Sequence, residues 1–411
     1  MSEDTPPPLE FLNPYNEEFQ RDPAAMLSRL RNATPVVRSE DAASLAVLGA
    51  EQVNAILRDP DLWVDPRKAR PETMLSLLAA PEGSEPSMLF SDDPRHRRLK
   101  TLVSASFTPR AIEQWRPRTI EIAAHLAEDL PGEFDLIERF AGPLPTWVIA
   151  EMLQVDTDRR DWFKHCSDAT AYAFFNPMCS DEERALGEDC GQQLREYFTE
   201  QIELRRSRPV ADGEGGLIGQ MMAAQSQAGG EDALSDEDII GQCSLLLIAG
   251  NITTTDLIGN GVASLLRHPD QWAELIEHPE LLPQAVEELL RYNPPVQSSG
   301  RIASEAGELG GCPFSRGESF MVSLLGANFD PAVNPEPDRL DIRRERPRHW
   351  SFGGGRHFCT GAALARMEAQ EALRVLTQKF PDLTLVEGGS ELRTMPGFRG
   401  YTRLCVRTGR A

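Results

Sequence analysis

The longest apolar run in the chain starts after Ser235-Asp236-Glu237-Asp238, a tetrapeptide with the form of a helix-capping box. Apolar residues then dominate to about Leu266, and His268-Pro269 stops the pattern. This predicts a helix of roughly thirty residues, about 45 Å long at 1.5 Å per residue. Because it is apolar on nearly all sides, we expect it to run buried through the middle of the protein.

The remaining pattern predicts a mainly α fold with a minor β-rich portion, arranged as one domain over residues 1–411. Helical spacing occurs over residues 15–31, much of 111–210, 284–293 and from 362 onward, and short strands are expected at 35–38, 45–48, 320–325 and 383–386. Residues 66–90 indicate a long loop with apolar side chains, 213–230 a glycine-rich connection, and 395–401 a turn between strands.

The centre of the long helix, Ala249-Gly250-Asn251-Ile252-Thr253-Thr254-Thr255, is poor in helix-forming residues. A helical glycine costs about 1 kcal/mol relative to alanine. Threonine hydroxyls can bond the carbonyl four residues back, so a local bend explains the segment without any function. A functional groove in the helix is the alternative.

A second unusual stretch is Phe352-Gly353-Gly354-Gly355-Arg356-His357-Phe358-Cys359-Thr360-Gly361. Its glycines allow backbone conformations closed to other residues and let the chain approach a flat ligand. Cys359 stands just ahead of a predicted helix, whose amides and dipole favour a thiolate. A glycine turn beside a buried cysteine is the plainer interpretation.

The charge composition of the chain limits the classes of molecule that it can be expected to bind. The chain has 42 basic and 64 acidic side chains, a formal charge of −22, which disfavours nucleic acid and anionic lipid. Residues 1–12 read as a loose acidic, proline-rich tail without signal-peptide features, and no apolar run is long enough to span a membrane. We therefore expect a cytoplasmic protein. We also expect it to be a monomer. Its seven cysteines are scattered without a Cys-x-x-Cys pair, which disfavours disulfides or a zinc site.

The segment Phe352–Gly361, read as Phe-x-x-Gly-x-His-x-Cys-x-Gly, resembles the haem-binding signature of the cytochrome P450 family. The resemblance implies a P450 fold with the long central helix over a haem b (iron protoporphyrin IX). It implies that Cys359 is the iron ligand, with Phe352 and Gly361 beside the haem. Thiolate ligation donates electron density that favours O–O cleavage.

Two further stretches match the haem-propionate contacts of that family. His96 and Lys100 stand where the family has His-x-x-x-Arg, so the positive charge is kept while the guanidinium fork is lost. The same residues could equally form a basic solvated helix face. Arg301, on a predicted strand, and His357 are the other expected propionate partners.

The centre of the long helix resembles the oxygen-activating groove of the family. The resemblance implies that the candidate catalytic residues are Gly250, Asn251, Ile252 and Thr253, with Thr253 assisting oxygen activation, and that Ala249 lies against the haem. The usual acidic residue is replaced by Ile252, which cannot relay a proton. Asn251 is one residue out of register, about 100° round the helix, and Asp256 lies almost one turn further on. Three explanations remain for how the reaction proceeds without an acid at position 252: a water chain that brings protons from elsewhere, protonation assisted by a substrate group, or a reaction that needs less proton delivery.

Glu288 and Arg291, at i and i+3, could be an ordinary surface ion pair on a helix. With Arg339 they resemble the buried Glu-Arg-Arg network that holds the cysteine loop in the family. An unpaired buried charge is costly, so Glu288→Ala is expected to abolish haem incorporation.

Together these motifs predict a haem-thiolate monooxygenase that inserts one oxygen atom of O₂ into a small hydrophobic substrate. The substrate-pocket candidates are apolar: Leu77, Met88, Phe174, Phe175, Ile248, Val296 and Phe398. No dinucleotide fingerprint follows a predicted strand, so the electrons must come from a partner protein. The resemblance to the soluble bacterial members of the family implies that this partner is a [2Fe–2S] or similar ferredoxin with its reductase. The alternatives are a peroxide-driven or non-oxygenase haem-thiolate enzyme and, less favoured, a non-catalytic haem sensor.

Overall fold

The computed structural model describes residues 16–39, 43–79, 85–208, 215–227 and 234–409; the expected tail at 1–12 lies outside them. Contacts divide the chain into two compact units. Unit 1 comprises residues 1–90, 260–359 and 392–401, and unit 2 comprises 91–259, 360–391 and 402–411. The single domain over 1–411 stays a prediction.

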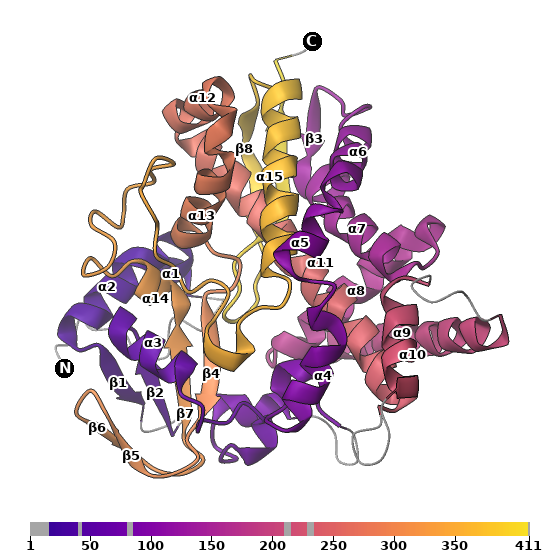
Figure 1. The fold of residues 1–411 in the computed structure, drawn as a ribbon. Helices are drawn as coiled ribbons and strands as arrows, with labels where there is room; N and C mark the ends of the chain where they lie inside the picture. Colours follow the sequence, from indigo (N-terminus) through magenta and orange to yellow (C-terminus); the bar gives the residue numbers. More distant parts are fainter. Residues whose placement is uncertain (1–15, 40–42, 80–84, 209–214, 228–233, 410–411) are drawn as a thin grey trace. The chain divides into compact units, whose positions relative to one another are not determined.

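Unit 1 is built on a four-stranded sheet with the order β1-β2-β7-β4, in which β2 pairs parallel to β7 and the other neighbours are antiparallel (Figure 1). Its strands are β1 (Val36–Ser39), β2 (Ser44–Val47), β4 (Ser298–Ile302) and β7 (Ser319–Ser323), with a separate hairpin of β5 (Gly307–Leu309) and β6 (Cys312–Phe314). Its helices are α1 (Glu17–Arg21), α2 (Pro23–Ala33), α3 (Ala50–Arg58), α12 (Pro269–Glu277), α13 (Leu282–Tyr292) and α14 (Leu324–Asn328). Two clusters of buried apolar side chains fill this unit, and both include residues of the sheet.

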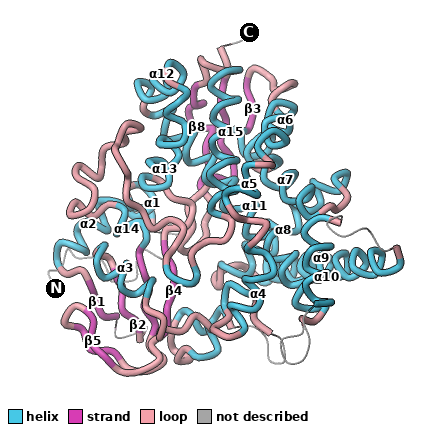
Figure 2. Tube along the Cα trace, viewed as in Figure 1, coloured by secondary structure: helices cyan, strands magenta, loops and turns pink. Residues whose placement is uncertain are grey.

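Unit 2 is mostly helical (Figure 2). Its helices are α4 (Arg95–Ser104), α5 (Pro109–Glu113), α6 (Arg116–Leu126), α7 (Pro143–Leu153), α8 (Arg160–Phe175), α9 (Asp181–Ser207), α10 (Gly216–Gln227) and α15 (Ala362–Lys379). A three-stranded sheet has the order β3-β9-β8, formed by β3 (Glu133–Asp135), β8 (Thr384–Leu392) and β9 (Tyr401–Arg407). Among the helices described here, none is long and apolar enough to cross a membrane.

The predicted long helix is α11 (Asp236–Arg267), 32 residues in length. Its first turn is closed by the expected capping box, in which the Asp238 amide donates to Ser235 Oγ at 3.1 Å and the Ser235 amide to Asp238 Oδ2 at 3.0 Å. Residues up to Gly259 belong to unit 2 and the rest to unit 1. The mainly α fold with minor sheets is therefore confirmed.

Candidate functional site

The cysteine loop of unit 1 is shaped by its glycines. Gly353 and Gly355 have φ of +68° and +63°, conformations that side chains with a Cβ rarely adopt. A Cβ on Gly355 would also lie 2.4 Å from the carbonyl oxygen of Leu57. The Cys359 amide donates to the Phe352 carbonyl at 3.0 Å, which closes the loop. The backbone thus fixes where the cysteine stands.

The side chain of the loop cysteine is exposed. Cys359 is exposed and the neighbouring Phe358 ring is 45% exposed, whereas the other six cysteines are buried or half-buried. Burial raises the pKa of the Cys166 thiol to about 12 and raises that of Cys243 as well. Those two thiols stay protonated, so they are poor metal ligands. Among the cysteines, Cys359 has the exposure that a ligand role needs.

On α11, in unit 2, a half-exposed stripe runs along an otherwise buried helix. Ala249, Gly250 and Thr253 belong to this stripe, while Ile252 is 3% exposed. A Cβ placed on Gly250 would meet no atom within 4 Å, so open space adjoins the helix there. The Thr253 hydroxyl donates to the Ala249 carbonyl at 2.7 Å, the backward bond expected of a helical threonine.

Asn251 faces away from that stripe, into the packing of unit 2. Its side chain is fully buried and accepts a bond from the Thr146 hydroxyl of α7 at 2.9 Å. Its amide nitrogen donates to Ser167 Oγ at 2.6 Å and Asp168 Oδ1 at 3.2 Å, both on α8. The residue therefore joins three helices, and Asp256, also fully buried, does not restore an acid at position 252.

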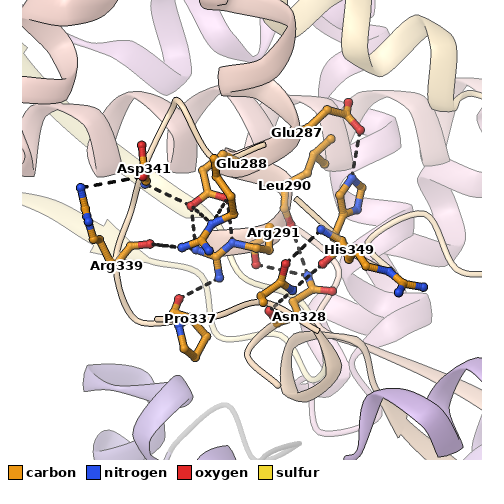
Figure 3. A network of polar contacts seen from close by, with 12 residues as sticks. Glu287, Glu288, Leu290, Arg291, Asn328, Pro337, Arg339, Asp341 and His349 are labelled. Carbon is orange, nitrogen blue, oxygen red and sulfur yellow. Dashed lines mark hydrogen bonds and ion pairs between the residues drawn. The ribbon is translucent and has the colours of Figure 1, made fainter. Parts of the chain in front are cut away.

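The predicted Glu288–Arg291 pair is fully buried in unit 1 (Figure 3). Arg291 Nε donates to Glu288 Oε2 at 2.7 Å and Nη2 donates to Oε1 at 2.8 Å, a bidentate arrangement. Arg291 also donates to the carbonyl groups of Pro337 at 2.7 Å and Arg339 at 3.1 Å. The pair is thus internal and tied to the segment that follows α14.

The third cation of this network differs from the expectation. The Arg339 side chain is 64% exposed and approaches Glu336 and Asp341 at 3.7 and 3.8 Å, so only its backbone carbonyl joins the network. Arg344 takes the expected place: its side chain is 13% exposed, and its Nε lies 3.1 Å from Glu288 Oε2. The sequence could not distinguish these arginines, because several follow one another between residues 339 and 348.

Asn328 carries the network to the residues that precede the cysteine loop (Figure 3). Its amide nitrogen donates to the carbonyls of Leu290 and Arg291 and to Ser351 Oγ, at 3.4, 3.2 and 3.0 Å. Its Oδ1 accepts from the Trp350 amide at 2.8 Å. This residue was missed by sequence reasoning, because an asparagine after a strand carries no signature of such a role.

Each unit holds two of the four expected propionate partners. In unit 2, His96 on α4 is 4% exposed, with Nδ1 3.5 Å from Asp93 Oδ1, and Lys100 is half-buried. In unit 1, Arg301 on β4 is 5% exposed and donates to the Gly300 carbonyl at 2.7 Å, and His357 is half-buried. Their role toward haem stays a prediction.

The pocket candidates fall into two groups. In unit 1, Val296 and Phe398 pair as an isolated antiparallel bridge, while Leu77 is 63% exposed and Met88 is half-buried. In unit 2, the rings of Phe174 and Phe175 at the end of α8 form an edge-to-face pair with centroids 5.0 Å apart.

Ile248 is half-buried, one residue before Ala249 on α11.

Comparison with known proteins agrees with this geometry. The family model "Cytochrome P450" matches residues 150–399. The chain belongs to the cytochrome P450 family. It is therefore a monooxygenase, a kind of oxidoreductase.

Among its relatives, "Biotin biosynthesis cytochrome P450" of Bacillus subtilis (strain 168) is 35% identical, over 95% of this chain and 97% of the relative. "Cytochrome P450 monooxygenase PikC" of Streptomyces venezuelae is 36% identical, over 98% and 94%. The solved structure of myxobacterial cytochrome P450 CYP267B1 in complex with myristic acid has a TM-score of 0.87 at 33% identity, covering 98% of this chain and 99% of that one. The P450 fold expected from the sequence is confirmed.

The residues present suit the haem-thiolate group of this family. Cys359 offers an exposed sulfur donor, and Gly250 leaves room beside α11 that a side chain would fill. Imidazole and cationic side chains are available in both units for carboxylate groups. The donor set is therefore that of a thiolate-ligated haem.

Proposed function

We propose that the chain is a haem b monooxygenase that hydroxylates, or similarly oxidises, a small hydrophobic substrate with O₂. The observation that carries the proposal is the exposed Cys359, at the end of a loop whose backbone is turned by Gly353 and Gly355 and closed by the bond from the Cys359 amide to the Phe352 carbonyl. When bound, a thiolate-ligated haem supplies the activation of O₂, with thiolate donation favouring O–O cleavage. Membership of the family supports this assignment.

The chain's own residues have distinct tasks in this scheme. Cys359 would hold the iron, and the loop glycines would let the backbone lie close to the ring. His96, Lys100, Arg301 and His357 would bind its carboxylates, with Phe352, Gly361 and Ala249 beside the ring. The Thr253 hydroxyl, now bonded to the Ala249 carbonyl, would hold and pass a proton on the open side of α11.

The iron ligand can be tested by matched cysteine variants. Cys359→Ser should lose the absorption band of the reduced, carbon-monoxide-bound thiolate haem, because the sulfur donor is removed. Cys312→Ser, which alters a half-buried thiol, should keep that band. A Cys359→Ser protein that retained the band would refute the assignment.

Electrons are proposed to come from a ferredoxin with its reductase, docked by cationic residues of an otherwise acidic chain. Arg97 is exposed and Lys100 is half-buried, so both can contribute. Arg98 contributes less, because it lies 3.9 Å from Asp238, and Arg356 donates to the Pro60 and Leu62 carbonyls.

Raising salt should slow reduction by ferredoxin, since such encounters are electrostatic. Arg97→Glu should slow it several-fold at low salt, whereas Arg195→Glu, at an exposed arginine of α9, should not. A rate independent of salt and of Arg97 would count against this surface.

A peroxide-driven enzyme is the second candidate, favoured by one observation: Ile252 is apolar and buried where the family has an acid. Such an enzyme would turn over with hydrogen peroxide and not with reduced ferredoxin. Product formation under the two conditions, measured with the same purified protein, separates the candidates.

The relatives suggest probes for that measurement. One solved neighbour is described in complex with myristic acid, and another with a hexadecenoic acid carried by acyl carrier protein. A shift of the haem absorption band on adding myristic acid would indicate that the pocket accepts an aliphatic ligand. The band can then rank other hydrophobic compounds.

A further inference from the structure

A cavity in unit 1 is lined by none of the residues of the cysteine loop. Its volume is about 440 Å³, and small-molecule sites in proteins span about 300–1,000 Å³. The inner wall includes Gln297, Leu325 and Phe329, which are 5%, 1% and 3% exposed. The residues at the mouth are exposed and charged: Arg21, Asp22, Arg267 and Asp338. The cavity is thus large enough for a small ligand and reaches solvent at a charged rim.

The side-chain amide of Gln297 is an unsatisfied donor in the inner wall. Among the residues that the structure describes, its Nε2 finds no hydrogen-bond partner, although the side chain is buried. A buried donor without a partner loses its hydration without compensation, so native structures contain few of them. The backbone of Gln297 is bonded: its amide donates to the Gly397 carbonyl at 2.8 Å and its carbonyl accepts from the Leu324 amide at 2.9 Å. The side-chain donor is thus left for a group that enters the cavity.

Arg399 brings a positive charge to the lining of the same cavity. Its Nη1 donates to Gln20 Oε1 at 3.1 Å and its Nη2 to the Gln20 carbonyl at 3.0 Å, and both acceptors are neutral. Within the part of the chain that the structure describes, this guanidinium forms no ion pair with a carboxylate. Burial lowers the pKa of Arg399, as expected for a cation whose charge is poorly compensated. The bonds to Gln20 use one donor on each Nη, so further N–H donors remain for a ligand.

The backbone brings these two side chains to one side of a paired segment. Val296 and Phe398 form an antiparallel bridge, with an amide-to-carbonyl bond of 2.8 Å on each side of it. Because side chains alternate along extended chain, Gln297 and Arg399 lie on the side opposite to Val296 and Phe398. Diagonal neighbours across such a pair are about 7–8 Å apart, so a single ligand can reach both.

We propose that this cavity binds a small carboxylate with a short apolar tail. The carboxylate would accept hydrogen bonds from the Arg399 guanidinium and from the Gln297 amide, which supplies the anion and the acceptor that the wall lacks. Tyr292, Leu325 and Phe329 offer apolar surface for the tail. Binding here goes beyond the proposed function and does not depend on it.

The charges at the mouth favour a single negative charge on the ligand. Arg21 and Arg267 attract an anion toward the cavity, while Asp22 and Asp338 disfavour a second charge on it. Asp22 cannot itself serve as the missing anion, because its Oδ1 accepts from the Ala25 amide at 2.9 Å at the start of α2. A monocarboxylate therefore matches the rim as well as the inner wall.

The test uses hexanoate as the probe and hexanamide, which has a similar shape without the charge, as its control. Calorimetric titration is carried out on the haem-loaded chain with phenylimidazole bound at the iron, so that the haem site is already occupied. Hexanoate should bind at a single site, and hexanamide should bind at least about tenfold more weakly, because a hydrogen bond to a charged group is lost. Arg399→Gln should weaken hexanoate binding by a similar factor, whereas Arg195→Gln, at an exposed arginine of α9, should not change it.

A second variant keeps the guanidinium and its bonds to Gln20. Gln297→Glu places a carboxylate of the chain itself on the wall beside Arg399, so it should abolish hexanoate binding without lowering the melting temperature. A wild-type chain that does not bind hexanoate, or binds hexanamide equally well, overturns the proposal whatever the variants do. Undiminished hexanoate binding by folded Arg399→Gln or Gln297→Glu protein overturns it as well.

Discussion

The buried network around Glu288 allows two neighbouring arginines to be compared directly. Arg344→Ala removes a cation 3.1 Å from the Glu288 carboxylate, in a side chain only 13% exposed. A hydrogen bond to a charged group contributes about 1.5–3 kcal/mol. Since Arg291 still holds Glu288 bidentately, we expect a loss near the lower end, about 2 kcal/mol of unfolding free energy.

Arg339→Ala is the matched control. The Arg339 side chain is 64% exposed, and the residue contacts the network only through its backbone carbonyl, which the alanine variant keeps. An exposed ion pair contributes about 0–1 kcal/mol, so the control should lose less than 1 kcal/mol. Urea unfolding of both haem-loaded variants, followed by haem absorbance and circular dichroism, measures the difference. Equal losses in the two variants, or a larger one at Arg339, would refute the assignment of Arg344 as the third cation.

Three further results are expected. Burial raises the pKa of Glu368 to about 8 in the folded chain, whereas in the unfolded chain the pKa is that of an ordinary glutamate. Between about pH 5 and 8 the folded chain therefore binds more protons, and this group lowers the unfolding free energy by up to about 1.4 kcal/mol for each unit that the pH rises. Glu368→Gln should flatten that slope in urea titrations at several pH values; an unchanged slope would contradict the raised pKa. Gly355→Ala combines a positive φ with a clash at the Leu57 carbonyl, so purified protein should contain little haem, and a full haem content would contradict this account. Asn251→Leu leaves the Ser167 hydroxyl and its neighbours without the buried amide, and should lower the melting temperature by several degrees; an unchanged melting temperature would argue against the three-helix contact.

The sequence was sufficient for features written in local patterns. The capping box at Ser235, the extent of α11 and the short sheet strands follow from periodicity and turn chemistry, and the structure confirms them. The cysteine loop was equally visible, because its glycines and Cys359 lie within ten consecutive residues. Local order of this kind needs no knowledge of distant contacts.

Features that depend on which distant side chains meet were not predictable. Arg344 and Arg339 are indistinguishable in sequence, and only the packing around Glu288 separates them. Asn251 was expected near the chemistry, yet its partners on α7 and α8 are more than eighty residues away in the chain. Glu368 resembles an ordinary helical glutamate until its burial is known. Each of these depends on tertiary neighbours that a single sequence does not name.

The acceptors around Arg291 have a consequence for engineering. Pro337 and Arg339 meet this guanidinium through their backbone carbonyls, not through their side chains. A saturation library at position 339 can therefore vary surface charge next to a buried ionic centre without changing the groups that neutralise it. Position 344, five residues further along, cannot be varied in this way, because there the side chain itself donates to the Glu288 carboxylate.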